Sequence, residues 1–190
     1  MSVRLALALL ALCSLAAASD PRCEELVEPQ CNHTQVIGKW IFHAGISELK
    51  ETEDELKAIN SSWIEISAVA DSKEMVLRWG DRNNEKCDYG SFKYNFSSNI
   101  SKVTFEYNST AFVGNYLKSC PDCLVWMDTM TNNEKGRSLY IFTKNGSLED
   151  SYLEMFKKQA SCVGFSGEIF FMDTTNLCPY VPKAKEEKEN

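Results

Sequence analysis

Two cysteines three residues apart, Cys120 and Cys123 in a Cys-Pro-Asp-Cys segment, are the clearest chemical signal in the chain. Such a pair can act as a redox dithiol, bind zinc or form a local disulfide. A redox pair requires a helix amino terminus, but this pair lies between two predicted strands. Zinc requires four ligands, and His33 and His43 are the only imidazoles. A type I turn with proline in its second position brings the flanking Cα atoms within ~7 Å, which suits a disulfide. We favour a structural bridge and predict no metal site.

The sequence shows no catalytic signature. It contains neither a Gly-x-Ser-x-Gly elbow nor a His-Glu-x-x-His helix. Its formal net charge is −7, from 20 basic and 27 acidic residues, whereas nucleic-acid-binding proteins generally carry a basic surface. We therefore predict that the chain is not an enzyme, takes no cofactor and binds no nucleic acid.

The first nineteen residues are typical of an export signal. Arg4 is followed by an apolar run over Leu5–Leu15 and by three alanines that suit signal peptidase, and the run is too short to span a bilayer. We predict a signal peptide at 1–19, one domain at 20–182 and a disordered charged tail at 183–190. Removing Arg4 leaves 19 basic and 27 acidic residues, a mature charge of −8. The product should be soluble, secreted and extracellular, with no membrane span.

Cysteines and glycosylation signals agree with an oxidising compartment. Cys13 leaves with the predicted signal, so seven cysteines remain, and one of them must be free or paired between chains. Six Asn-x-Ser/Thr sequons occur where roughly two are expected by chance, and we predict a heavily glycosylated protein. The predicted sites are Asn32, Asn60, Asn95, Asn99, Asn108 and Asn145.

The elements that must position these residues are short strands separated by turn residues, a pattern typical of an up-and-down barrel or sandwich. We expect eight strands, at Lys39–Ala44, Ser62–Ser67, Glu74–Trp79, Tyr89–Phe96, Lys102–Tyr107, Ala111–Lys118, Leu124–Thr129 and Ser138–Thr143. Mostly short connections favour a closed antiparallel barrel. A helix should start near Ser147 and pack outside against Tyr140 and Phe142, and residues 168–172 should add a short ninth strand. The long acidic connection over 45–61 is either a lid over the mouth or a solvated loop.

Taken together, these features resemble the α1-acid glycoprotein (orosomucoid) group of lipocalins, and within it the fish proteins that bind saxitoxin, tetrodotoxin and organotin compounds. The resemblance covers essentially the whole mature chain. It rests on Cys23-Glu-Glu-Leu, Ile37-Gly-Lys-Trp-Ile-Phe, Asn60-Ser-Ser-Trp, Leu77-Arg-Trp, Cys120-Pro-Asp-Cys and the Cys162…Cys178 tail. It implies an eight-stranded barrel with one closed end, an open mouth and a ligand cavity between them. It also implies disulfides Cys23–Cys162 and Cys87–Cys178, which leaves Cys31 as a lone thiol, a dimer link or a competing partner.

Alternation along the strands, combined with the resemblance, gives the candidate ligand-binding residues. Trp40 would form the floor, and Lys118 with the hydroxyls of Tyr94 and Tyr116 would orient a guest. The complete predicted set is Trp40, Phe42, Ile64, Ile66, Leu77, Trp79, Phe92, Tyr94, Phe105, Tyr107, Tyr116, Lys118, Val125, Met127 and Ile141.

The function expected from this arrangement is reversible binding of small, largely hydrophobic molecules by a monomer. Acidic residues of the long connection (Glu51, Glu53, Asp54 and Glu55) would draw cationic or toxin-like ligands to the mouth. The alternative is an extracellular interaction or immune-modulating protein, in which a filled barrel serves as a scaffold for loops and glycans.

Overall fold

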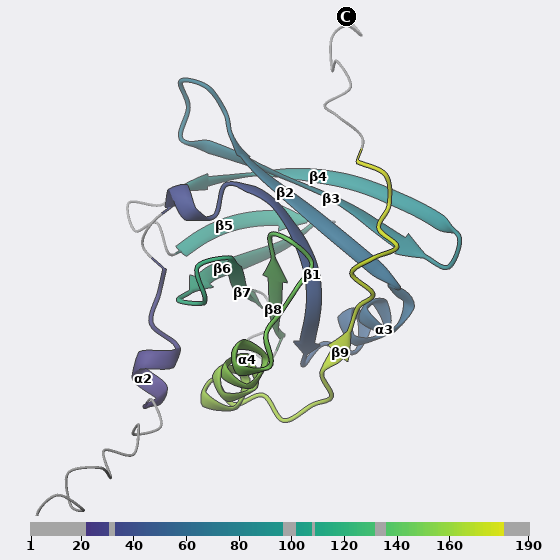
Figure 1. Ribbon diagram of the computed structural model, residues 1–190. Helices are drawn as coiled ribbons and strands as arrows, with labels where there is room; N and C mark the ends of the chain where they lie inside the picture. The colour runs from purple at the N-terminus through teal and green to yellow at the C-terminus, as the bar shows by residue number, and fades with distance from the viewer. Residues whose placement is uncertain (1–21, 31–32, 97–101, 108, 132–135, 181–190) are drawn as a thin grey trace, which may run out of the picture.

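The computed structural model describes residues 22–30, 33–96, 102–107, 109–131 and 136–180. In this part of the chain, eight strands form an antiparallel barrel in sequence order, and β1 closes it by pairing with both β8 and β2. This confirms the predicted fold class and the eight predicted strands (Figure 1). The strands are β1 (Gly38–Ser47), β2 (Ser61–Ala68), β3 (Glu74–Asn83), β4 (Lys86–Phe96), β5 (Lys102–Tyr107), β6 (Thr110–Leu117), β7 (Cys123–Met130) and β8 (Arg137–Thr143).

Four shorter elements and one long helix lie around the barrel. The amino-terminal arm contains α2 (Cys23–Leu26) and the 3-10 turn η1 (His33–Gln35), and α3 (Lys50–Ala58) occupies the connection between β1 and β2. The helix α4 (Asp150–Cys162) follows β8, and β9 (Phe170–Phe171) adds a ninth strand on β1, as predicted. None of the helices formed by the described residues is long and apolar enough to cross a membrane.

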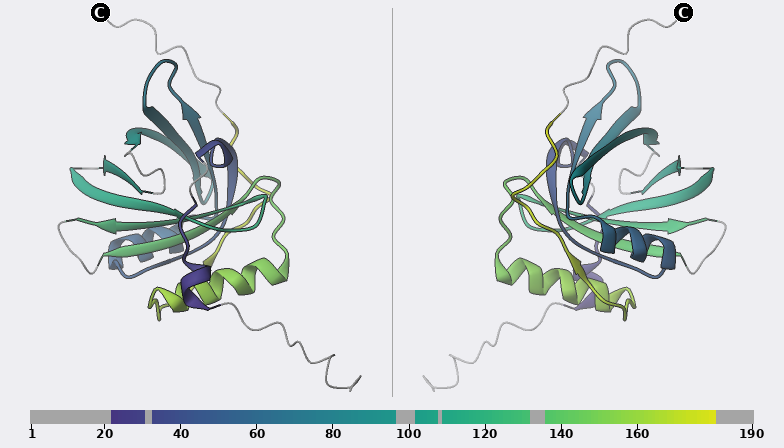
Figure 2. Two further views of the ribbon diagram at one scale, coloured as in Figure 1. Left: turned by 90° about the vertical axis from the view of Figure 1, so that its left-hand side faces the viewer. Right: turned by 90° about the vertical axis from the view of Figure 1, so that its right-hand side faces the viewer.

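Packing of α4 decides which faces of β7 and β8 point inward. Phe156 and Ala160 of α4 are buried against Val125, Leu139 and Ile141 on the outside of the barrel, where Figure 2 shows the helix lying. The prediction that Val125, Met127 and Ile141 face inward is therefore wrong, as is the prediction that Tyr140 and Phe142 form the platform for the helix. Both faces of these strands are rich in apolar residues, so alternation alone could not choose between them.

Trp40 seals the closed end of the barrel. Its side chain is 1% exposed, and its indole nitrogen donates a hydrogen bond to the carbonyl oxygen of Val36 at 2.8 Å. The ammonium group of Lys144 lies 5.2 Å from the ring centroid, within range of a cation–π contact. The indole N–H of Trp40 therefore has a hydrogen-bond acceptor although the side chain is buried.

Three disulfides tie the outer segments to the barrel. Cys23–Cys162 joins the amino-terminal arm to the end of α4, Cys87–Cys178 joins β4 to the carboxyl-terminal segment, and Cys120–Cys123 closes the turn between β6 and β7. The first two bridge 139 and 91 residues of sequence. Long loops of this kind give the largest stabilisation in the chain-entropy model.

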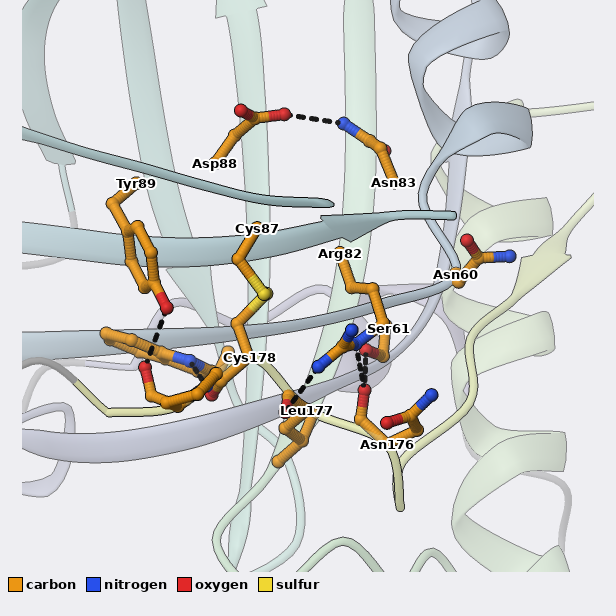
Figure 3. The surroundings of a disulfide bond; sticks show 12 residues. Asn60, Ser61, Arg82, Asn83, Cys87, Asp88, Tyr89, Asn176, Leu177 and Cys178 are labelled. Carbon is orange, nitrogen blue, oxygen red and sulfur yellow. Dashed lines mark hydrogen bonds between the residues drawn. A yellow bond between two sulfur atoms is a disulfide. The ribbon is translucent and has the colours of Figure 1, made fainter. Parts of the chain in front are cut away.

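The carboxyl-terminal segment around Cys178 is bound along the outside of β2, β3 and β4 (Figure 3). Trp63 donates its indole N–H to the carbonyl oxygen of Cys178 at 2.9 Å, and the guanidinium of Arg82 donates to the carbonyl oxygens of Asn176 and Leu177. The hydroxyl of Tyr89 donates to the carbonyl oxygen of Pro179 at 3.0 Å. The segment is therefore fixed by main-chain recognition as well as by its disulfide.

Candidate ligand-binding cavity

A cavity of about 270 Å³ lies inside the barrel. Its walls are mostly aromatic and aliphatic, with a few polar groups, which is the usual composition of a small-molecule site. The lining residues are Phe42, Thr52, Glu55, Leu56, Ile59, Ser62, Ile64, Ile66, Leu77, Trp79, Asp81, Phe92, Phe105, Tyr107, Phe112, Tyr116, Leu124, Trp126, Asp128, Ser138, Tyr140 and Phe142.

Aromatic rings form a connected set along one side of this cavity. The rings of Phe92 and Phe105 are stacked with centroids 4.7 Å apart, and Phe105 stacks on Phe112 at 5.1 Å. Trp79 meets Tyr107 edge to face at 5.5 Å. Flat rings with accessible faces can contact both apolar surfaces and organic cations.

The structure brings most of the predicted residues to the cavity wall. Those that line it are Phe42, Ile64, Ile66, Leu77, Trp79, Phe92, Phe105, Tyr107 and Tyr116. Trp40 and Tyr94 do not line it, although both belong to the buried cluster packed around it. The hydroxyl groups of Tyr94 and Tyr116 are 3.1 Å apart, and burial raises the pKa of both, that of Tyr94 to about 12. These phenols therefore stay neutral.

Lys118 was also predicted to face the cavity, but it lies outside. It follows β6 at the closed end of the barrel, where its ammonium group forms an ion pair with Glu28 at 2.6 Å. Its main-chain N–H donates to the carbonyl oxygen of Glu28, so the amino-terminal arm holds it there. The alternation that places Tyr116 inside ends with the strand and does not extend to this residue.

Several lining residues were missed by the sequence analysis. Leu124, Trp126, Tyr140 and Phe142 belong to the faces of β7 and β8 that were assigned outward. Leu56 and Ile59 come from the connection before β2, whose helix α3 reaches the cavity and so supports the lid interpretation of this segment. The Cβ atom that a side chain at Gly45 would add lies 3.2 Å from Leu56, which shows how closely α3 packs on β1.

The buried carboxyl of Asp128 is the most unusual polar group in the wall. Its side chain is 8% exposed, and the indole nitrogen of Trp126 donates a hydrogen bond to it at 3.1 Å. Burial raises the pKa of Asp128 to about 7, although hydrogen bonds from Trp126 and Ser138 act in the opposite direction. None of the ion pairs formed by described residues includes this carboxyl, so its charge has no fixed counter-ion.

A second carboxyl, Asp81, lines the cavity near the end of β3. Its cross-strand partner on β4 is Asp88, and like charges directly opposite each other destabilise a sheet. Burial raises the pKa of Asp81 to about 6, with the charges of Asp88 and Glu55 adding to the effect and a hydrogen bond from Ser62 opposing it. We call the end of the barrel that carries Asp81 and Asp128 the mouth.

Of the four acidic residues predicted near the mouth, Glu55 lines the cavity. Burial, followed by the charge of Glu51, raises the pKa of Glu55. Glu53 and Asp54 are paired instead with lysines of their own helix, Lys57 at 3.1 Å and Lys50 at 2.6 Å. The acidic character of the cavity therefore comes from Asp81, Asp128 and Glu55, on three separate elements.

The remaining predicted sites lie on the surface or outside the described residues. Asn60, Asn95 and Asn145 are exposed, and a glycan on any of them would point to solvent. Asn32, Asn99, Asn108 and Cys31 lie outside the described residues. No group of three or more His, Cys, Asp or Glu side chains in the described part of the chain could hold a metal ion.

A closed eight-stranded antiparallel barrel with an internal cavity and a helix packed outside defines the chain as a lipocalin. The ApoM domain model matches residues 12–179, and the chain belongs to this family. Lipocalins are in general binding and transport proteins.

Known proteins show the same relationship. Alpha-1-acid glycoprotein from Oryctolagus cuniculus is 24% identical over 200 aligned positions, which cover 99% of this chain and 96% of that protein. Among solved structures, the siderocalin Ex-FABP, a protein that functions through dual ligand specificities, superposes with a TM-score of 0.62. The two chains are 13% identical, and the match covers 74% of this chain and 95% of that one. A dog lipocalin allergen superposes with a TM-score of 0.60 and 16% identity, and the match covers 76% of this chain and 97% of that one. Both are similar in fold.

Proposed function

We propose that this protein is a secreted glycoprotein that binds and carries, or sequesters, small and largely hydrophobic molecules inside its barrel. The observation that carries the proposal is an aromatic cavity of about 270 Å³ with carboxyl groups at its mouth. In this proposal residues 1–19 are a signal peptide, residues 20–182 the binding domain and residues 183–190 a charged tail. The three disulfides fit an oxidising, extracellular compartment.

Apolar surface supplies the affinity. Each Å² of ligand surface removed from water contributes about 25 cal/mol, and aromatic faces such as those of Phe92 and Trp126 provide most of the contact. The alternative of a filled scaffold that acts through loops and glycans is less well supported, because the barrel interior contains a cavity rather than a solid core.

The carboxyl groups of the cavity favour a ligand that carries a positive charge. Asp128 and Asp81 have no ion-pair partner among the described residues, and the neighbouring rings attract cations through their faces. We therefore propose cationic amphiphiles as the preferred ligands, with guanidinium toxins and organotin compounds as candidates on account of the resemblance to the fish proteins. The binding role requires no catalytic step, no cofactor and no second subunit.

The test compares two variants on neighbouring positions of β3. Leu77 lines the cavity, whereas Val76 points to the opposite face of the same strand. Leu77→Trp should fill part of the cavity and weaken binding of 1-aminoanthracene, a flat apolar probe, by about tenfold or more, the equivalent of 1.4 kcal/mol. Val76→Trp adds the same side chain outside and should bind normally. Circular dichroism would verify that both variants are folded. Equal affinities for the two variants, or no binding by the unmodified protein, would refute the proposal.

A further inference from the structure

The junction between β4 and β5 differs from every other junction of the barrel. Among the described residues, two pairs join these strands, Asn95 with Thr104 and Phe96 with Val103. By comparison, β3 and β4 share ten pairs and β5 and β6 share six. If the same register continued towards the mouth, Lys93 and Phe92 of β4 would face Glu106 and Tyr107 of β5, but no ladder joins these four residues. We call this part of the wall the β4–β5 seam (Figure 2).

Two oppositely charged residues on the outer face of the seam, Lys93 and Glu106, form no ion pair with each other in the described part of the chain. If the register continued from Asn95 and Thr104, Lys93 would lie directly opposite Glu106. Both residues are exposed. A continuous ladder would bring such a pair within contact distance.

Aromatic side chains close the seam in place of main-chain hydrogen bonds. Phe92 on β4 stacks on Phe105 of β5 at 4.7 Å, and Tyr107 of β5 contacts Trp79 at 5.5 Å. All four rings line the cavity, and Tyr107 is 41% exposed to solvent. These rings can therefore move apart without breaking a strand pairing, because no ladder of the described residues joins β4 to β5 at this point.

The helix α3 lies against the mouth, where Glu55 and Leu56 line the cavity. Leu56 of α3 is 4% exposed and belongs to the same buried cluster as Phe42. Movement of α3 away from the mouth would expose Leu56 and also Ile59, which packs on that cluster. Opening the mouth would thus expose the buried Leu56, whereas opening the seam would separate Phe92 and Phe105, which are only partly buried against the same cluster.

We propose that the β4–β5 seam is a side entrance through which apolar ligands enter and leave the cavity. This inference rests on the proposed binding function and adds the route that ligands take. A flat aromatic or chain-like ligand can replace Phe92 or Phe105 in the ring stack as it passes. A ligand longer than the cavity can also remain bound with one end projecting through the seam.

The test is a crosslink across the seam. Lys93→Cys and Glu106→Cys are introduced in a Cys31→Ala background and joined with a bismaleimide, and mass spectrometry verifies the bridge. The matched control joins Glu106→Cys to Ala111→Cys, a paired position on β5 and β6. Association and dissociation rates of 1-aminoanthracene are measured by stopped-flow fluorescence, and its affinity by titration.

The seam crosslink should lower both rate constants by about tenfold or more, which corresponds to a barrier higher by about 1.4 kcal/mol, and leave the equilibrium affinity within about twofold. The control crosslink should change neither rate. Unchanged rates in the seam variant, or equal slowing in both variants, would overturn the side entrance while the binding function stands. A complete lack of binding before crosslinking would instead refute the binding function, and the side entrance with it.

Discussion

Replacing Asp128 with asparagine should remove most of the pH dependence of stability in this protein near neutral pH. The side chain keeps its shape and can still accept the hydrogen bond from Trp126, but it loses its ability to ionise. In the native protein the pKa of Asp128 is raised by burial from 3.8 to about 7. Between these two values the native state binds more protons than the unfolded state, so the free energy of unfolding must fall as the pH rises.

The magnitude follows from the same two pKa values. A difference of one pH unit corresponds to 1.36 kcal/mol, so ionisation of Asp128 should destabilise the unliganded protein by about 2.5 kcal/mol between pH 5 and pH 8. The stabilisation is complete below the unfolded value near 3.8 and is lost as the pH passes the native value near 7. Asp81, whose native pKa is about 6, should add a separate loss at lower pH in both proteins.

Urea unfolding followed by far-ultraviolet circular dichroism at pH 5, 6, 7 and 8 measures this directly. Between pH 5 and pH 8 the unfolding free energy should fall in both proteins. The fall should be smaller in Asp128→Asn than in the unmodified protein, by about 2.5 kcal/mol. Glu106→Gln is the matched control, because Glu106 is exposed on the outer face of β5, and this variant should keep the loss of stability that ionisation of Asp128 causes. The same pH profile in Asp128→Asn and the unmodified protein would refute the assignment of this titration to Asp128.

Three further results are expected. In calorimetric titration, a naphthalene that carries a trimethylammonium group should bind more tightly at pH 8 than at pH 5.5, because the ionised form of Asp128 attracts it and the neutral form does not. Its neutral tert-butyl isostere should bind with the same affinity at both pH values. Gly114→Ala should lower the unfolding free energy by about 1–3 kcal/mol in urea titration, because a Cβ atom there would lie 1.9 Å from the ring of Trp126. Replacing Cys87 and Cys178 with alanines should lower the unfolding free energy by about 4–5 kcal/mol, because this disulfide closes a loop of 91 residues. The same replacement of Cys120 and Cys123, which close a loop of 3, should lower it by only about 2 kcal/mol. Equal losses in denaturant unfolding would contradict this ranking.

The strands could be predicted from the sequence where charged residues interrupt the apolar pattern. Glu65 and Arg78 point to one face of β2 and β3, where they form an ion pair at 3.4 Å, and this fixes Ile66 and Leu77 on the other face. The turn residues between strands set the strand order, because neighbours joined by short turns pair with each other. The local residue pattern was therefore sufficient to predict the barrel and the inner faces of β2 and β3.

The inner faces of β7 and β8 could not be predicted in the same way, because the deciding contact is tertiary. Asp128 shares a face with Trp126, and a carboxylate is normally assigned to solvent. Val125 and Met127 were predicted to face inward, but the packing of α4 places them on the outer face. Asp81 was missed for a related reason, since the polar run that begins at Asp81 reads as a turn although β3 continues to Asn83.

The residues that oppose folding are concentrated at the mouth. Asp128 is buried without a counter-ion among the described residues, and Asp81 lies opposite Asp88 on the neighbouring strand. Trp40, at the closed end, is buried with its indole N–H hydrogen-bonded. Departures from packing rules are expected where a protein has a function to perform. A cation bound at one hundred times its dissociation constant would stabilise the native state by about 2.7 kcal/mol. At that ligand concentration, binding would offset the roughly 2.5 kcal/mol that ionisation of Asp128 removes by pH 8. Ionisation of Asp128 thus lowers the stability of the unliganded barrel while it raises the affinity for cations.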